Sequence, residues 1–166
     1  DQSPIVSDTG ELVWDPAGGK GLFTINTPRT KALIGFVKDQ PYALGGMLVR
    51  PGKTVQGWLA LTLSAMEGGD IGQPGSFLLT ATGNSENRGM AFNADRTRYT
   101  WGERPVLVES INAVITLPVS PDRVKVWTLD ERGNTKASVE VLDEKGKARI
   151  EIGGRYRTLW YKIQVR

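Results

Sequence analysis

Hydrophobic and polar residues alternate in short runs along this chain, and the alternation has a period of two. In the run from 58 to 66, Leu59, Leu61 and Leu63 share one phase, whereas Trp58 shares the other phase with alanine, threonine and serine. Successive side chains of a β-strand point to opposite faces of the sheet. The run therefore predicts a strand with one buried face and one wetter face, and it puts Trp58 on the wetter face.

Two further tryptophans have the same placement. Trp160 shares its phase with Lys162, and Trp127 shares its phase with Lys125. Indole has a large apolar face and one hydrogen-bond donor, which suits a flat surface that binds a ligand. The alternative interpretation is that both faces of these strands are covered, because large sheets often stack on other layers.

Similar runs recur between turns along the whole sequence. The 20 glycines and nine prolines separate segments rich in Val, Ile, Leu, Thr and aromatic residues, which is typical of an all-β domain. Strands are predicted at 11–14, 21–26, 32–37, 47–50, 54–66, 76–83, 106–110, 113–117, 123–130, 137–142, 148–152 and 158–165. So many strands exceed one open sheet of ordinary size. We therefore expect a single domain over residues 1–166, folded as an all-β, two-layer antiparallel β-sandwich of jelly-roll-like character with essentially no helix.

The alternation also predicts which residues face inward and where hairpins turn. The residues expected on the inner faces are Leu59, Leu61, Leu63, Ile115, Leu117, Val124, Val126, Tyr161 and Ile163. The glycine-containing segments 17–21, 130–134 and 143–147 predict hairpin loops between strands. Thr27 and Pro28 have the residue types of a helix start, but a glycine soon interrupts the pattern, so we expect a strand or a single turn there.

The stretch from 83 to 104 departs from this strand rhythm, and we expect a loop without regular structure. Loops of this length are uncommon and often functional. A sugar site combines flat aromatic faces, on which the axial C–H groups of a pyranose pack, with planar polar side chains that pair with hydroxyl groups. The aromatic candidates are Phe92, Tyr99 and Trp101, and the polar candidates are Asn84, Glu86, Asn87, Arg88, Asn93, Asp95 and Arg96. The alternative is a structural loop that its aromatics pin to the end of the sandwich, with its arginines and carboxylates paired to one another.

Composition and charge narrow the function classes. The chain has no cysteine and no histidine, which excludes a disulfide framework, the usual zinc sites, and Ser–His or Cys–His catalysis. Its net charge of +3 comes from scattered Lys and Arg without a basic run, so nucleic acid is not an expected partner. No uncharged apolar stretch is long enough to span a bilayer, so no membrane partner is expected. Because the chain starts at Asp1 without an initiator Met, we expect a processed protein or a piece of a larger one.

The carboxylates do not indicate an enzyme. A glycosidase needs two carboxylates at a fixed separation, and the acids here mostly neighbour Gly, Asn or Thr, where turns account for them. The chain has no phosphate-binding loop and no dinucleotide fingerprint. No cofactor and no transition metal are expected. A structural calcium is the alternative, with Asp8, Glu11 and Asp15, or Asp122 and Asp143, as ligands.

Four segments of the sequence resemble one known kind of domain. They are SDTGELVWD (7–15), GLFTINTPRTKALIGF (21–36), LLTATGNSENRGMAFNADRTRYTWGERPVLVE (78–109) and the closing RYRTLWYKIQVR (155–166). Together they resemble the β-sandwich accessory domain found C-terminal to the catalytic barrel in some bacterial glycoside hydrolases. The segments 87–90 and 93–96 match that pattern best, and Phe92 stands where a tryptophan is expected before Asn93. The resemblance implies a non-catalytic module, cut from a secreted, extracellular enzyme that degrades polysaccharides.

We therefore expect a carbohydrate-binding module that targets its parent enzyme to a β-glucan- or xylan-type polysaccharide and is not itself an enzyme. Its expected partners are the polysaccharide and the catalytic domain of the parent enzyme. The residues expected to bind sugar are Trp101, Tyr99, Asn87, Asn93, Arg96, Trp58, Trp127 and Trp160. The alternative is a structural accessory domain in which Trp58, Trp127 and Trp160 form an apolar patch that docks on the catalytic barrel and stabilises it without binding sugar.

Overall fold

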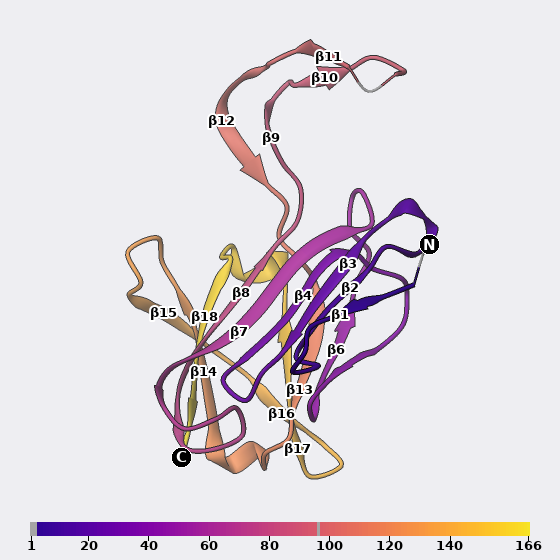
Figure 1. Ribbon diagram of the computed structural model, residues 1–166. Coiled ribbons are helices and arrows are strands. Elements are labelled where there is room, and N and C mark those ends of the chain that lie inside the picture. Colours follow the sequence, from indigo (N-terminus) through magenta and orange to yellow (C-terminus); the bar gives the residue numbers. More distant parts are fainter. Residues whose placement is uncertain (1–2, 96) are drawn as a thin grey trace.

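The computed structural model describes residues 3–95 and 97–166, and it consists almost entirely of β-strands and the turns between them (Figure 1). Within those residues, the helical segments are three single turns of 3-10 helix, at Ala17–Gly19, Pro121–Arg123 and Gly154–Tyr156. All the paired strands run antiparallel. The predicted all-β, two-layer antiparallel sandwich is confirmed.

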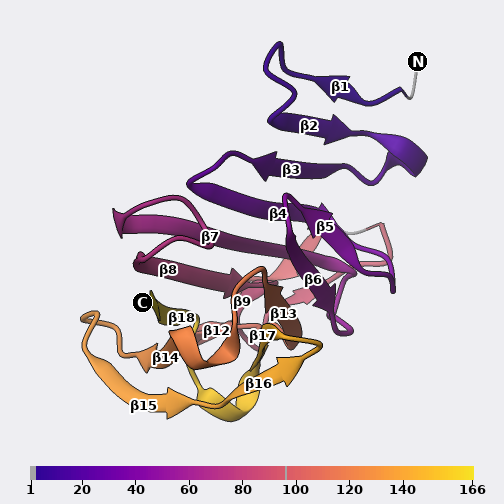
Figure 2. The same ribbon diagram turned by 90° about the horizontal axis from the view of Figure 1, so that it is seen from below.

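The larger sheet has nine strands. Their order across the sheet is β1 (Ile5–Val6), β2 (Leu12–Asp15), β3 (Leu22–Asn26), β4 (Thr30–Phe36), β7 (Trp58–Gly68), β8 (Gly75–Thr82), β18 (Trp160–Val165), β14 (Val124–Leu129) and β15 (Thr135–Val139). Figure 2 shows β1, β2, β3, β4, β7 and β8 side by side in this order.

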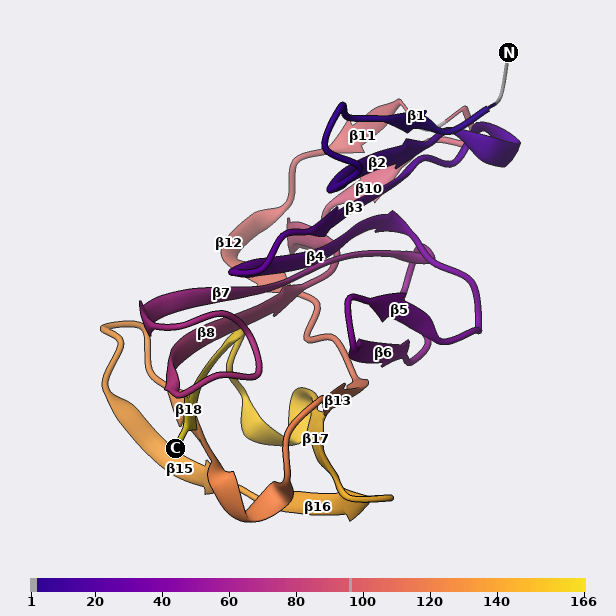
Figure 3. The same cartoon turned by 60° about the horizontal axis from the view of Figure 1, so that its bottom comes forward.

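The smaller sheet has five strands and lies within the curve of the larger one (Figure 3). Their order is β16 (Val141–Glu144), β17 (Lys147–Ile152), β13 (Ala113–Leu117), β6 (Met47–Pro51) and β5 (Tyr42–Leu44). The chain passes from one sheet to the other between β4 and β5, β6 and β7, β8 and β13, β13 and β14, β15 and β16, and β17 and β18. These crossings tie the two layers together and fit the jelly-roll-like prediction.

The hydrophobic core lies between the two sheets. Along β7, Leu59, Leu61 and Leu63 are at most 1% exposed, while the residues between them are only half-buried. All the residues predicted for the inner faces are buried: Leu59, Leu61, Leu63, Ile115, Leu117, Val124, Val126, Tyr161 and Ile163. The period-two pattern therefore identified the core correctly on both layers.

Each predicted run contains a strand, but two boundaries need correction. The run 54–66 becomes a strand only at Trp58. The run 137–142 is two strands, because Val139 pairs in the larger sheet and Val141 pairs in the smaller one. No glycine or proline marks this crossing in the sequence. The strands β1 and β5 were not predicted, since both are very short strands at the edges of their sheets.

The predicted turns are confirmed. The segments 17–21, 130–134 and 143–147 each join neighbouring antiparallel strands. At the proposed helix start, the hydroxyl oxygen of Thr27 accepts a hydrogen bond from the N–H of Thr30 at 2.9 Å, which closes a single turn. The strand β4 then begins at Thr30, so a turn and a strand form there, as expected.

The segment 83–104 forms regular structure, so the prediction of an irregular loop is wrong. β9 (Ser85–Arg88) pairs with β12 (Glu103–Val108), and β10 (Ala91–Phe92) pairs with β11 (Arg98–Thr100). These strands make a two-stranded ribbon, called the arm below and spanning residues 84–109. Figure 1 shows the arm projecting from one end of the sandwich.

Local hydrogen bonds bend and close the arm. The N–H of Met90 donates to the carbonyl of Asn87 at 3.0 Å, which turns the chain between β9 and β10. The N–H of Asn93 donates to the carbonyl of Thr97 at 2.8 Å, which closes the tip. Because β9 has no face packed on the sandwich, its sequence lacks the alternating apolar residues that mark the other strands.

The buried phase of β7 makes a first prediction. Leu61→Ala removes a side chain that is 0% exposed and should lower the free energy of unfolding by about 2–5 kcal/mol. Met66→Ala in the same strand removes a side chain that is 61% exposed, and it should change the free energy of unfolding by less than about 0.5 kcal/mol. Urea denaturation followed by tryptophan fluorescence measures both. Equal losses in the two variants would contradict the assignment of the inner face.

Candidate functional site

The three tryptophans predicted for the wetter faces of their strands lie on the outer face of the larger sheet, as the alternation predicted. Trp58 and Trp127 are half-buried and Trp160 is 38% exposed, whereas Leu59, Val126 and Tyr161, which follow or precede them on the other phase, are buried. The structure does not bring Trp58 together with the other two. Strand β8 lies between Trp58 on β7 and Trp160 on β18. On the same face, the hydroxyl groups of Thr62 and Thr80 hydrogen-bond to each other at 2.8 Å.

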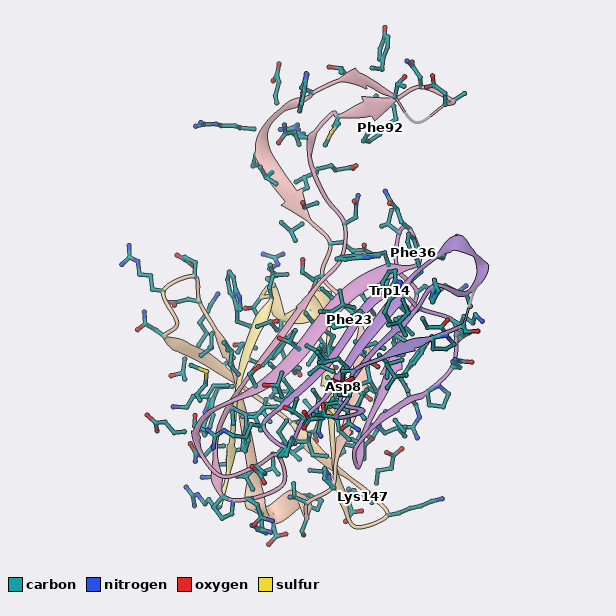
Figure 4. The ribbon with its side chains drawn as sticks, in the orientation of Figure 1. Asp8, Trp14, Phe23, Phe36, Phe92 and Lys147 are labelled. Carbon is teal, nitrogen blue, oxygen red and sulfur yellow. The ribbon has the colours of Figure 1, made fainter. Side chains whose placement is uncertain are left out.

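Three aromatic residues that were not predicted as site residues lie on this outer face. In the pairing register, Trp14 is opposite Phe23, and Phe36 is opposite Trp58. The indole of Trp14 lies directly on Gly21, where an added Cβ would overlap the ring. We call Trp14, Phe23, Phe36 and Trp58 the aromatic strip. It crosses β2, β3, β4 and β7, and Figure 4 shows its first three members close together.

A depression of about 430 Å³ lies at the β7 end of the aromatic strip, where the arm leaves the sandwich. Its lining consists of Phe36, Gln56, Trp58, Gly83, Asn84 and Ser85. Two aromatic rings therefore share one depression with two primary amides and a hydroxyl group. Rings of this kind pack against C–H groups, and primary amides both donate and accept hydrogen bonds. The depression has the chemistry to hold a neutral ligand with many hydroxyl groups.

One carboxylate fixes the backbone beside this depression. Oε1 of Glu109 accepts a hydrogen bond from the N–H of Val55 at 2.6 Å, and Oε2 accepts one from the N–H of Asn84 at 3.0 Å. The N–H of Glu109 in turn donates to the carbonyl of Asn84 at 2.8 Å. Gly83 allows this approach, because an added Cβ there would overlap the carboxylate. Glu109 therefore joins the root of the arm to the sandwich and holds Asn84 in place.

The predicted aromatic residues of the arm are exposed. Phe92 is 50%, Tyr99 76% and Trp101 68% exposed, and Phe92 lies out on the arm in Figure 4. The alternative in which these aromatics pin a loop to the end of the sandwich is therefore wrong. The ribbon pairing carries the segment away from the sandwich, so its rings do not reach the core.

The predicted polar partners on the arm take part in its own structure. Nδ2 of Asn87 donates to the carbonyl of Trp101 at 2.9 Å, and Nδ2 of Asn93 donates to the hydroxyl of Thr97 at 3.0 Å. The hydroxyl and the N–H of Thr97 both donate to Asp95, and these bonds lower the pKa of that carboxyl. The amides of Asn87 and Asn93 thus stabilise turns of the arm. Arg96 lies outside the described residues.

The outer face of the smaller sheet is charged and carries the larger depression, of about 470 Å³. Its lining includes Arg50, Asn112, Glu151 and Arg155, and no aromatic residue. Arg50 pairs with Glu144 at 3.3 Å, and Glu151 pairs with both Arg149 and Arg155. A hydrogen bond from Thr116, and then the neighbouring Arg50, lower the pKa of Glu144. Each of these charged groups already has an oppositely charged partner, which makes this face a weaker candidate for a ligand site than the depression at the aromatic strip.

Three of the five carboxylates considered for calcium serve local turns. Asp15 accepts a hydrogen bond from the N–H of Ala17 at 2.9 Å, and Asp143 accepts one from the N–H of Gly146 at 2.7 Å. Asp122 accepts one from the hydroxyl of Ser120. Within residues 3–95 and 97–166, no group of three or more Asp, Glu, His or Cys residues is arranged to hold a metal ion.

In the described part of the chain, no helix has the length and apolarity that a membrane crossing requires. No protein-family model, no curated protein and no solved structure matches this chain.

The exposure of the arm makes a second prediction. Chymotrypsin cleaves after aromatic residues in accessible backbone, and loop tips are the preferred sites of nicking. The first cuts should therefore fall after Phe92, Tyr99 or Trp101, while the sandwich stays intact. Mass spectrometry of a time course identifies the cuts. First cleavage next to a core aromatic such as Tyr161, which is 1% exposed, would contradict this arrangement.

Proposed function

We propose that this chain is a non-catalytic carbohydrate-binding module of a larger, secreted bacterial enzyme that degrades polysaccharides. The observation that supports the proposal most strongly is the depression at the root of the arm. There, Phe36 and Trp58 lie beside the side chains of Gln56, Asn84 and Ser85. Among the depressions of the described surface reported above, it is the one that combines two aromatic rings with amide and hydroxyl groups.

Each group in the depression has a role with a sugar. The faces of Phe36 and Trp58 pack against the axial C–H groups of a pyranose ring, which removes apolar surface from water. The amides of Gln56 and Asn84 donate to and accept from sugar hydroxyls. Because Glu109 already holds the backbone of Asn84, little ordering of that residue is left to occur on binding.

The aromatic strip points to an extended ligand of low charge. It runs across four neighbouring strands, which lie about 4.8 Å apart. A flat, extended β-linked chain of the glucan or xylan type has the shape to cross these strands and contact more than one ring. Lys20 places its Nζ 5.6 Å from the centre of the Phe36 ring, and its ammonium group also donates to hydroxyls.

Affinity electrophoresis against a panel of soluble polysaccharides tests this function and yields a third prediction. At least one glucan or xylan should retard the chain, and Trp58→Ala should weaken binding by about two- to tenfold, since one aromatic stack contributes about 0.5–1.5 kcal/mol. Asn84→Ala should weaken binding as well. Trp127→Ala is the matched control, because this half-buried tryptophan of the same face does not line the depression.

Two outcomes would contradict the proposed site. If no polysaccharide of the panel retards the folded chain, the proposal that it binds carbohydrate fails. If glycans retard the chain but Trp101→Ala abolishes the effect while Trp58→Ala does not, sugar binds to the arm rather than to the depression.

The absence of catalysis is a fourth prediction. The carboxylate beside the depression, Glu109, accepts hydrogen bonds from two backbone N–H groups, which is a structural task and leaves it poorly placed as a proton donor. The purified chain should release no reducing ends from mixed-linkage glucan, xylan or mannan. Steady release that a single change such as Glu109→Gln abolishes would overturn the assignment as a binding module.

A second candidate function, docking on a catalytic barrel, is supported by the other end of the aromatic strip. Ile5, Trp14, Phe23 and Ile34 follow one another in a single cross-strand row, and the first two are 68% and 41% exposed. A row of apolar residues on an outer face is typical of a protein-docking surface. Quenching of tryptophan fluorescence by acrylamide separates the two functions. Added glycan protects Trp58 from the quencher only if the depression binds sugar.

A further inference from the structure

The arm carries an apolar segment that the rest of the described chain does not cover. Val106, Leu107 and Val108 of β12 are 58%, 49% and 42% exposed. Val106 and Val108 point to one face of the ribbon and Leu107 points to the other, so both faces are apolar at this place. Isolated two-stranded ribbons are marginally stable in water, and exposed apolar strands tend to be covered by a partner.

One edge of β12 also has unpaired backbone groups. In the described chain, β12 pairs on one side with β9 and has no strand on the other side. The N–H of Glu109 donates to the carbonyl of Asn84, and the carbonyl of Glu109 accepts from Gly83, so both groups of Glu109 point toward the β9 side. Backbone groups alternate between the two sides of an antiparallel strand. The N–H and C=O groups of Val106 and Val108 therefore point to the free edge.

The face of β12 that carries Val106 and Val108 is not packed against the sandwich. A groove of about 310 Å³ runs between the arm and the sandwich. Val106 and Val108 line one side of it, and Leu159 and Trp160 line the other. The sandwich thus leaves this face of β12 open, and a partner strand would add beside it at the free edge, in the plane of the ribbon.

A second copy of this chain supplies the matching chemistry. If two β12 strands pair antiparallel about a two-fold axis at Leu107, then Val106 of each copy faces Val108 of the other. The outward N–H and C=O groups of these residues then pair reciprocally, and the two Leu107 side chains face each other across the axis. This is an isologous contact, in which the same surface of both copies is buried.

The neighbouring register is less favourable. An axis at Val106 would set Leu107 opposite Pro105 of the other copy, and Glu103 opposite Glu109. In that register, Leu107 no longer faces Leu107 of the other copy. The carboxylates of Glu103 and Glu109 also face each other, and like charges directly opposite in a sheet are destabilising. The register centred on Leu107 matches apolar residues with apolar residues at all three positions.

We propose that this chain self-associates through antiparallel pairing of β12 with β12 of a second copy, centred on Leu107. This interaction surface is separate from the depression proposed to bind sugar, and neither depends on the other. The pairing of β12 with β12 buries only a short segment of each chain. The buried area is therefore far below that of a standard stable interface, and the dimer dissociates on dilution. The result is a reversible two-module assembly that presents two glycan sites.

A dilution series followed by analytical ultracentrifugation tests the proposal and gives a fifth prediction. The average mass of the unmodified chain should rise from one copy toward two as the concentration increases. Leu107→Lys and Leu107→Asp should each stay monomeric, because like charges then face each other across the axis. An equimolar mixture of the two variants should dimerise again. Val108→Pro should also stay monomeric, because it removes a donor from the free edge.

Met66→Lys is the matched control, since it charges an exposed apolar residue on the sandwich, 61% exposed, and should dimerise like the unmodified chain. Circular dichroism checks that every variant keeps the sandwich fold. A chain that stays monomeric up to its solubility limit would overturn the proposal. Self-association that survives Leu107→Lys and is lost in Trp14→Ala would overturn it too, because the contact would then use the aromatic strip.

Discussion

The rest of this structure depends on the burial of one sheet against another of smaller width. Leucines on one phase of β4, β7 and β8 pack inward, and Leu33, Leu61 and Leu79 are completely buried. Because the inner face takes these aliphatic residues, the alternate residues of the same strands must point outward. The nine-stranded sheet also extends beyond its five-stranded partner at the β1 end, where Val6 is 54% exposed. The aromatic residues of these strands therefore lie on the outer face, where the proposed function places ligand binding.

The junction between the sandwich and the arm connects the candidate site to the projecting ribbon. The chain leaves β8 at Gly83, and the first residue of the arm, Asn84, lines the depression. Glu109 closes the junction from the returning strand by accepting hydrogen bonds from Val55 and Asn84. The two chain segments that enter and leave the arm are thus held together where the depression forms. The depression and the arm both lie outside the hydrophobic core, so the packing of the core does not depend on either of them.

Much of the fold could be predicted from the sequence, because the alternation of residues such as Leu59, Leu61 and Leu63 reports burial directly. The same alternation placed Trp58, Trp127 and Trp160 on the outer face. It could not show which strands are neighbours, so it could not bring Phe36 to Trp58 or separate Trp58 from Trp160. The strands β9, β10 and β11 of the arm escaped prediction for a different reason, although the run 106–110 did predict part of β12. Burial creates the period-two pattern, and neither face of β9 is buried in the core, so its sequence resembles that of a loop. Asn87 and Asn93 were predicted as ligand-binding residues of a loop, but in the arm their amides hydrogen-bond to Trp101 and Thr97.

The central claim is that the depression beside Phe36, Trp58 and Asn84 binds carbohydrate. The most direct measurement is a titration of the isotope-labelled chain with a soluble β-linked oligosaccharide, followed by the amide and indole N–H signals in nuclear magnetic resonance spectra. The account predicts that the indole signal of Trp58 and the backbone and side-chain amides of Gln56, Asn84 and Ser85 shift together with one saturation curve, while the indole signals of Trp101 and Trp127 do not move. Shifts confined to the arm, or no shifts with any oligosaccharide, would contradict it.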